Sequence, residues 1–291
     1  MRSLLTLLIL CLLPLAACSD RGDDYGDAMS REHADDTPTA TPLSTPSGTA
    51  DVVTEEVVYA TVDGTRMMGF VARPATDGDV EAGSTPGLIV IHEWWGLNDN
   101  IRAMAEKLAA EGYVALAVDL YGGDVAETPE QARSLMSASM EREAALTSNV
   151  TQAYDYLAAQ GGVENVGVIG WCFGGGWSLR TALALPNDID AAAIYYGQLV
   201  TDPDQLATLD MPILGIFGGE DQGIPVAQVR TFEQRLDSLG ANATVEIYEG
   251  AGHAFANPSG ERYVPEAAED AWQKTLAFFD RYLKGDGSDT M

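Results

Sequence analysis

The amino-acid sequence predicts an α/β fold: a mostly parallel central sheet, helices on both of its faces, and an antiparallel hairpin at the start. Short apolar runs that suit buried strands alternate with longer amphipathic stretches that suit helices, which is the pattern of βαβ units. The chain has 291 residues, of which 46% are hydrophobic, enough for one large domain with a sizeable core.

The elements follow in order along the chain. Alternating residues on either side of Asp63-Gly64 predict the hairpin, and Asn98 or Asn100 is placed to cap the first helix. The strands are expected at 52–60, 67–72, 87–92, 113–118, 166–169, 191–195, 212–217 and 243–248. The helices are expected at 101–110, 129–160 with a break near 140, 177–184, 226–239 and 265–284.

The first residues are typical of an export signal rather than of the fold. Arg2 precedes an apolar run, and small residues lead to Cys18. This pattern predicts a lipoprotein signal peptide at residues 1–17 with lipid attached to Cys18, and the alternative is ordinary cleavage with Cys18 incidental. We therefore expect an exported protein, held by its lipid on the periplasmic or outer side of a bacterial membrane.

The composition changes sharply after Cys18. Residues 18–50 are acidic and rich in Thr and Pro, with few bulky apolar side chains, so we expect a disordered tether there. The folded domain is expected at 51–286 and a flexible tail at 287–291. The net charge of −28 argues against binding to nucleic acid, and we expect a monomer that reaches the membrane only through its lipid.

The most informative stretch surrounds Cys172. It follows the predicted strand at 166–169 and precedes a predicted helix, and Gly170 and Gly174 stand two residues on either side of it. A nucleophile elbow has this pattern, because the sharp turn leaves no room for a Cβ at those two positions. Once Cys11 and Cys18 are removed or lipidated, Cys172 is the single remaining thiol.

Two further segments complete a candidate catalytic triad. Asp221, with Glu220 as its rival, follows the predicted strand at 212–217, and His253 follows the last strand in a glycine-rich turn. The order nucleophile, acid, histidine is that of α/β-hydrolases. His253 would remove the proton of the thiol, and Asp221 would orient the imidazole. The amides of Phe173 and Trp94 are the candidate oxyanion hole.

Each of these residues also has a structural interpretation. Cys172 can be a buried inert thiol, Asp221 a loop or cap residue, and His253 a surface histidine. The tryptophans at the strand ends, Trp95 and Trp171 among them, fit either the core or an apolar substrate pocket. A metal site at His92 and Glu93 is disfavoured, since adjacent strand residues point to opposite faces. We expect no metal and no cofactor.

The cysteine elbow, the Gly-Gly-Glu-Asp loop, the Gly-His turn and the run from His92 to Asn98 together resemble the dienelactone hydrolase family over roughly residues 52–285. The resemblance implies one α/β-hydrolase domain without a large cap, and a triad of Cys172, Asp221 and His253. It also assigns to Glu93 the role of pairing with the resting thiol and releasing it when substrate binds.

The sequence departs from this family where its best-known members bind a substrate carboxylate with two arginines. Gly122 and Gly123 stand at one such position, and Arg262 is displaced from the other. We therefore expect a hydrolase of neutral esters, lactones or thioesters, with Tyr121 in contact with the substrate. The alternative is a non-catalytic lipoprotein that uses the same pocket for binding.

Overall fold

The computed structural model describes residues 21–34, 36, 51–75 and 85–285. Its centre is an eight-stranded sheet in the order β1-β2-β4-β3-β5-β6-β7-β8. The strands are β1 (Val52–Val62), β2 (Thr65–Pro74), β3 (Gly87–Ile91), β4 (Val114–Val118), β5 (Val166–Trp171), β6 (Ala191–Tyr195), β7 (Ile213–Gly218) and β8 (Ala243–Tyr248). From β4 to β8 neighbouring strands run parallel, which confirms the predicted mostly parallel sheet.

The N-terminal hairpin is also confirmed, and it is longer than expected. β1 and β2 pair antiparallel, and β2 continues antiparallel against β4. Asp63 and Gly64 make the turn with φ values of 50° and 79°, a left-handed pair that suits a two-residue hairpin loop. The hairpin therefore extends the parallel sheet by two strands at one edge.

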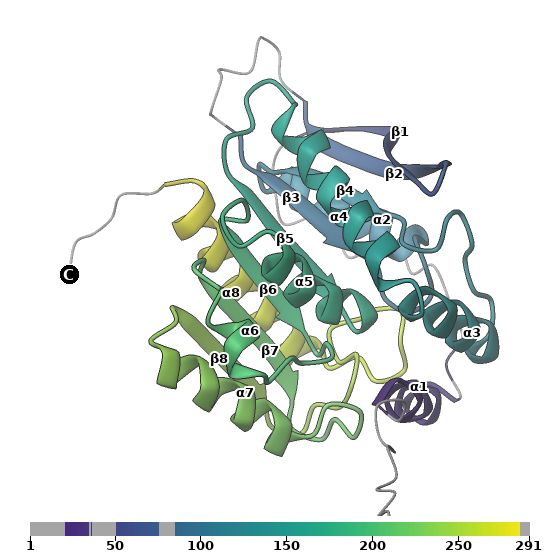
Figure 1. The fold of residues 1–291 in the computed structure, drawn as a ribbon, viewed down its shortest axis with the longest axis vertical. Helices are drawn as coiled ribbons and strands as arrows, with labels where there is room; N and C mark the ends of the chain where they lie inside the picture. Colours follow the sequence, from purple (N-terminus) through teal and green to yellow (C-terminus); the bar gives the residue numbers. More distant parts are fainter. Residues whose placement is uncertain (1–20, 35, 37–50, 76–84, 286–291) are drawn as a thin grey trace, which may run out of the picture.

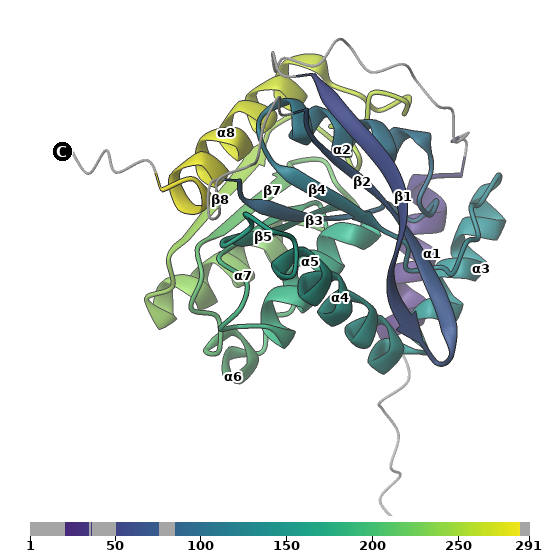
Figure 2. The ribbon, with the colours of Figure 1, turned by 90° about the horizontal axis from the view of Figure 1, so that it is seen from above.

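Helices cover both faces of the sheet. Figure 2 shows α2 and α8 on one face and α4, α5 and α7 on the other. The helices after the hairpin are α2 (Asp99–Ala110), α3 (Pro129–Met140), α4 (Glu143–Ala158), α5 (Phe173–Ala184), α6 (Pro203–Leu206), α7 (Val226–Leu239) and α8 (Pro265–Leu283). Asn98 caps α2, and the break expected near residue 140 separates α3 from α4.

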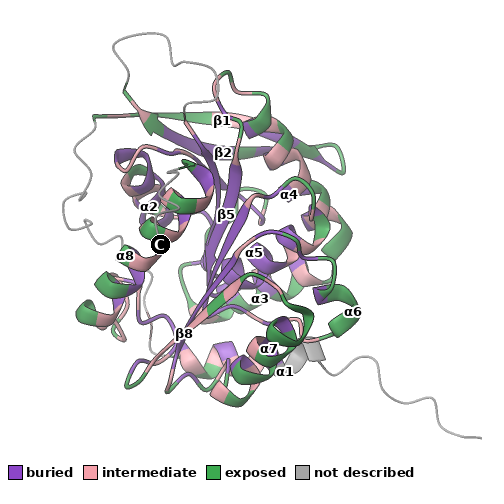
Figure 3. Ribbon diagram, turned by 90° about the vertical axis from the view of Figure 1, so that its left-hand side faces the viewer, coloured by how far each residue is buried: buried purple, intermediate pink, exposed green. Residues whose placement is uncertain are grey.

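The central strands are buried on both faces (Figure 3), as their continuous apolar sequences predict. Every residue of β3, β5, β6 and β7 is buried, while β8, at the sheet edge, is partly exposed. Because these strands run parallel, their carboxyl ends lie at one edge of the sheet, where the loops of an α/β protein carry its ligand-binding residues.

The prediction of a disordered tether is wrong for part of its length. Arg21–Glu32 form the helix α1, which lies beside α3 (Figure 1). Tyr25 and Met29 are one helical turn apart and both are buried, so the helix gains the tertiary packing that a short isolated helix lacks. The predicted signal peptide, Cys18 and the predicted C-terminal tail lie outside the described residues. Within the described part of the chain, no helix has the length and apolar character to cross a membrane.

Candidate active site

The turn at Cys172 has the strained geometry of a nucleophile elbow. Cys172 connects β5 to α5 with φ 56° and ψ −117°, a conformation that L-residues rarely adopt. A Cβ at Gly170 would lie 2.2 Å from the carbonyl oxygen of Gly174, and one at Gly174 would lie 2.3 Å from that of Ile91. Both glycines are therefore required by close backbone contacts, as the sequence pattern predicts.

His253 and Asp221 meet at the same edge of the sheet. His253 Nδ1 lies 2.7 Å from Asp221 Oδ2, and both side chains are fully buried. The other carboxylate oxygen of Asp221 accepts hydrogen bonds from the amides of Gly223 and Ile224, each at 2.8 Å. These bonds fix the carboxylate, which holds the proton of the imidazole on Nδ1 and leaves Nε2 free to act as a base.

The thiol of Cys172 lies next to this imidazole. The ligand atoms of Cys172 and His253 are within 4.8 Å of each other, but Nε2 of His253 has no hydrogen-bond partner among the described residues. The geometry of the pair thus falls short of a well-formed hydrogen bond, although charge and hydrogen bonding to His253 both lower the pKa of the thiol. Such contacts commonly tighten only when substrate is bound.

Charge interactions set the protonation of the pair. Burial alone raises the pKa of the Cys172 thiol, but the charges of His253 and His33 outweigh burial and lower the pKa to about 6. Burial likewise lowers the pKa of His253, while Asp221 and Cys172 raise it well above its ordinary value. Near neutral pH the pair is therefore a thiolate beside an imidazolium, the reactive form of a cysteine nucleophile.

Glu93 is buried near the thiol, but no hydrogen bond joins it to Cys172 among the described residues, so the pairing that the family resemblance implied stays a prediction. Its Oε2 atom accepts a hydrogen bond from Asn257 Nδ2 at 2.6 Å, and the sulfur of Met29 lies 3.9 Å from that of Cys172. Burial and the charge of Cys172 raise the pKa of Glu93 to about 7. Glu93 thus remains a titratable group close to the thiolate and bonded to an amide.

The N-terminal segment closes the site from outside. Met29 Sδ lies 3.9 Å from Cys172 Sγ, and Met29 and Cys172 are both fully buried. The ring of His33 packs against Trp94 at 4.5 Å and against His253 at 5.2 Å. The nucleophile is consequently covered by residues that we expected to be part of the tether.

A second carboxylate-histidine pair lies within this cover. His33 Nδ1 is 2.6 Å from Asp36 Oδ2, and Arg262 binds the same carboxylate at 2.8 Å. Arg262 also donates to the carbonyl oxygens of Glu32 and His253. Arg262 thus connects the N-terminal segment directly to the turn that carries the triad histidine.

The remaining predicted residues surround the elbow. Phe173 begins α5, so its amide is among the first-turn N–H groups that lack an intrahelical acceptor, and Trp94 follows β3 in a turn. Tyr121 packs against Phe173 at 5.3 Å, and Trp95 packs against Trp94 at 5.1 Å. Trp171 is buried against Tyr195 at 5.5 Å.

Sequence reasoning missed several residues of the site. His33 and Met29 belong to the N-terminal segment, and Asn257 follows His253 at short range, while Arg262 was noted only as displaced from a family position. Tyr196, at the end of β6, has φ 35°, and its hydroxyl is buried without a partner among the described residues. The spacing of Tyr25, Met29 and His33, four residues apart, was a signal for one helical face, but the acidic composition concealed it.

His92 is not available to bind a metal. Its Nδ1 is 2.5 Å from the carbonyl oxygen of Glu93, and its Nε2 accepts from the amide of Leu120 at 3.1 Å. Burial lowers the pKa of this imidazole, which keeps it neutral. His92 therefore holds the loops after β3 and β4 together.

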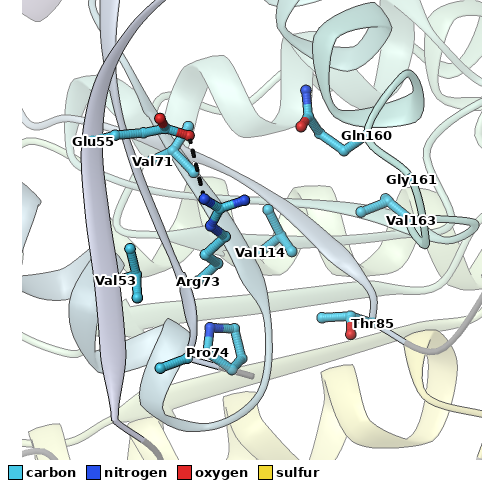
Figure 4. A pocket seen from close by; sticks show the side chains of 11 residues that line it. Val53, Glu55, Val71, Arg73, Pro74, Thr85, Val114, Gln160, Gly161 and Val163 are labelled. Atoms are coloured by element: carbon cyan, nitrogen blue, oxygen red, sulfur yellow. Dashed lines mark ion pairs between the residues drawn. The ribbon is translucent and has the colours of Figure 1, made fainter. Parts of the chain in front are cut away.

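A separate pocket opens at the other end of the sheet (Figure 4). It measures about 310 Å³, and Arg73 and Glu55 form an ion pair at its wall. Thr85, Val114 and Val163 line it at the starts of β3, β4 and β5. This is the amino end of the parallel strands, away from the edge that carries Cys172, so the pocket has no part in the triad chemistry.

Comparison with known proteins agrees with this geometry. The sequence profile of the "Dienelactone hydrolase family" matches residues 67–283. The chain belongs to the dienelactone hydrolase family. It is thus an enzyme of this family with an α/β-hydrolase fold, and the matched range runs from β2 to the end of α8.

Relatives of the enzyme occur in distant microorganisms. "Protein usf" of Aquifex pyrophilus is 34% identical over 76% of this chain and 96% of its own length. A protein of Saccharolobus solfataricus named "Putative carboxymethylenebutenolidase" is 30% identical over 79% of this chain and 100% of its own. The crystal structure of a "Putative Dienelactone Hydrolase" from Klebsiella pneumoniae is 29% identical. It superposes with a TM-score of 0.70 and covers 80% of this chain and 100% of its own.

Proposed function

We propose that the enzyme hydrolyses neutral carboxylic esters, lactones or thioesters through a Cys-His-Asp triad and an acyl-enzyme intermediate. The single observation that carries the proposal is the strained elbow at Cys172 beside the buried His253–Asp221 pair. The names of its relatives support a lactone or ester as the substrate class.

The chemistry follows from the protonation of the site. The thiolate of Cys172 attacks the carbonyl carbon, a C–S bond forms, and the amides of Phe173 and Trp94 bind the resulting oxyanion. The intermediate collapses as the C–O bond breaks, and His253 gives its proton to the departing alcohol. Water then loses a proton to His253 and attacks the thioester, which releases the acid and restores the thiolate.

The preference for a neutral substrate rests on the arginine content of the site. Arg262 donates a hydrogen bond to the carbonyl oxygen of His253 at 3.0 Å, and Asp36 already binds its guanidinium group at 2.8 Å. A carboxylate of the substrate would have to compete with Asp36 for a single guanidinium, without the paired clamp that bidentate recognition needs. The acidic surface adds long-range repulsion of anions, which salt weakens.

Turnover requires displacement of the N-terminal segment, because Met29 occupies the space beside the nucleophile. We propose that the described conformation is the closed form of the enzyme. We also propose export and lipidation at Cys18. In that case Ser19 and Asp20 alone separate the membrane anchor from α1, so the cover of the active site lies next to the lipid surface.

The test is a panel of matched neutral and anionic esters, lactones and thioesters, assayed with the wild type and with Cys172→Ala. We expect turnover of neutral members that Cys172→Ala abolishes. Equal turnover of dienelactone and a neutral aryl ester would contradict the substrate preference. Absence of any Cys172-dependent turnover, with iodoacetamide labelling that does not depend on His253, would favour the non-catalytic binding module. Loss of labelling by radioactive palmitate in Cys18→Ser tests the anchor.

A further inference from the structure

Four side chains with metal-binding atoms surround one point in the closed site. The ligand atoms of His33, Cys172 and His253 all lie within 4.8 Å of one another. The thioether sulfur of Met29 lies 3.9 Å from the thiol sulfur. All four side chains are buried, with exposed fractions of 2% for His33 and 0% for the other three.

The two histidines are oriented in the same way. A carboxylate binds Nδ1 of each ring, Asp36 at 2.6 Å from His33 and Asp221 at 2.7 Å from His253. Nε2 of each ring is buried and has no hydrogen-bond partner among the described residues. A carboxylate on the far nitrogen is the usual support of a metal-binding histidine, because it fixes the tautomer and makes the free nitrogen a better donor.

Arg262 does not prevent this arrangement. One guanidinium nitrogen lies 2.8 Å from His33 Nδ1, but it lies equally close to Asp36 Oδ2 and can donate to that carboxylate. The N–H group at Nδ1 of His33 then donates its hydrogen bond to the same carboxylate of Asp36. Nε2 of His33 is left as a lone-pair donor that faces the thiol.

We propose that His33, Cys172 and His253 form a binding site for a thiophilic transition-metal ion, which holds the N-terminal segment in its closed position. Tetrahedral zinc has bonds of about 2.3 Å to sulfur and about 2.0 Å to nitrogen, so its ligands lie roughly 3.5 Å apart. Three atoms already within 4.8 Å need to approach one another by at most about 1.3 Å. Because the pair is a thiolate beside an imidazolium near neutral pH, His253 loses its Nε2 proton to solvent when the ion binds.

The ion would act as an inhibitor rather than as a cofactor. It takes up the lone pairs of the nucleophile and of the base, so hydrolysis stops until the ion leaves. It also joins the segment around α1 to the catalytic domain through His33. Inhibition by the ion rests on the proposed hydrolase function. Binding of the ion is measured without turnover, so a failed binding experiment leaves the hydrolase proposal standing, and a failed activity assay leaves the metal site standing.

The donor set distinguishes between two metals. Two histidines and a cysteine suit zinc, whereas the same set with a distant methionine suits copper. Met29 is therefore the discriminating residue. Met29→Leu is expected to weaken binding of Cu(I) and to leave binding of Zn(II) nearly unchanged.

The experiment is a titration of the full chain with Co(II), read by the thiolate-to-cobalt charge-transfer band, followed by displacement with Zn(II). We expect one ion per chain, with the band lost in Cys172→Ser. Affinity is expected to fall at least about 100-fold in His33→Ala and in His33→Gln, and about 10- to 100-fold in Asp36→Asn. Arg31→Ala, an exposed position of the same helix, is the matched control and is expected to bind as the wild type does.

Two results would overturn the proposal. One is the absence of a charge-transfer band, which would mean that the acidic surface alone binds the ion. The other is unchanged affinity in both His33 variants, which would leave the segment outside the site. An anaerobic Cu(I) titration against a competing chelator, with wild type and Met29→Leu, then decides between copper and zinc.

Discussion

Two carboxylate-histidine pairs face the same thiol, and they reach it by different routes. His253–Asp221 comes from the loops after β8 and β7, so the register of the sheet fixes its position. His33–Asp36 comes from a segment that precedes the domain and contacts the site through Met29, the ring of Trp94 and Arg262. The first pair, here called the fixed pair, belongs to the hydrolase domain. The second, here called the attached pair, belongs to an N-terminal segment that packs on that domain.

This difference separates the residues that set the reactivity of Cys172 from those that control access of substrate to it. In the proposed mechanism the fixed pair must remain in place throughout the reaction, because it moves protons between substrate, thiol and water. The attached pair covers the nucleophile and must leave before a substrate can enter. Variants in matching positions of the two pairs are therefore expected to change activity in opposite directions. All assays below contain EDTA, so that no bound ion contributes.

The largest effect is expected from the histidines. His253→Ala removes the general base and should lower kcat by about 10³- to 10⁵-fold. His33→Ala removes a ring of the cover and should raise kcat/KM, because the closed form loses its contacts with Trp94 and His253. Steady-state assays on one neutral aryl ester measure both. A fall in kcat in His33→Ala comparable to that in His253→Ala would mean that His33 takes part in catalysis, and would contradict the distinction between the two pairs.

The carboxylates should show the same contrast on a smaller scale. Asp221→Asn disturbs the tautomer of His253 and should lower kcat by about 10²- to 10⁴-fold. Asp36→Asn weakens the bond to His33 and to Arg262, so kcat/KM should rise or stay level. Circular dichroism of both variants serves as the control for folding. A lower kcat in Asp36→Asn would show that the attached pair supports the chemistry.

The pH dependence of alkylation tests the charge pairing at Cys172. Because the thiolate forms as pH rises through the thiol pKa, the rate of iodoacetamide labelling should rise with a midpoint of about 6. Without the charge of His253 the midpoint should return towards about 8.5, which makes labelling at pH 7 roughly 30-fold slower. The measurement is a rate profile of wild type and His253→Ala, and coincident midpoints would contradict the pairing.

The smallest effect is expected from the apolar contact of the cover. Met29→Ala leaves a cavity beside the thiol, weakens the closed form, and should raise the rate of labelling about tenfold. Arg31→Ala changes an exposed position of α1 and should have no effect. Equal labelling rates in wild type and Met29→Ala would mean that the cover does not limit access to the thiol.

The sequence by itself determined the sheet, its hairpin and the places of Cys172, Asp221 and His253 in the fold, because these depend on local patterns. Buried strands need continuous apolar runs, the elbow needs glycines two residues before and after Cys172, and the acid and the histidine follow strands whose carboxyl ends must meet at one edge. For the same reason the order of nucleophile, acid and base could be predicted without any contact being known.

Only the tertiary structure decided what lies against the nucleophile. Tyr25, Met29 and His33 occur in an acidic segment whose composition predicts disorder, and α1 becomes stable through packing against a domain that begins well after it in the sequence. The partner of Glu93 was decided in the same way, since Asn257 is brought to it from the loop after β8. Contacts between segments far apart in the sequence leave no local pattern from which they can be predicted.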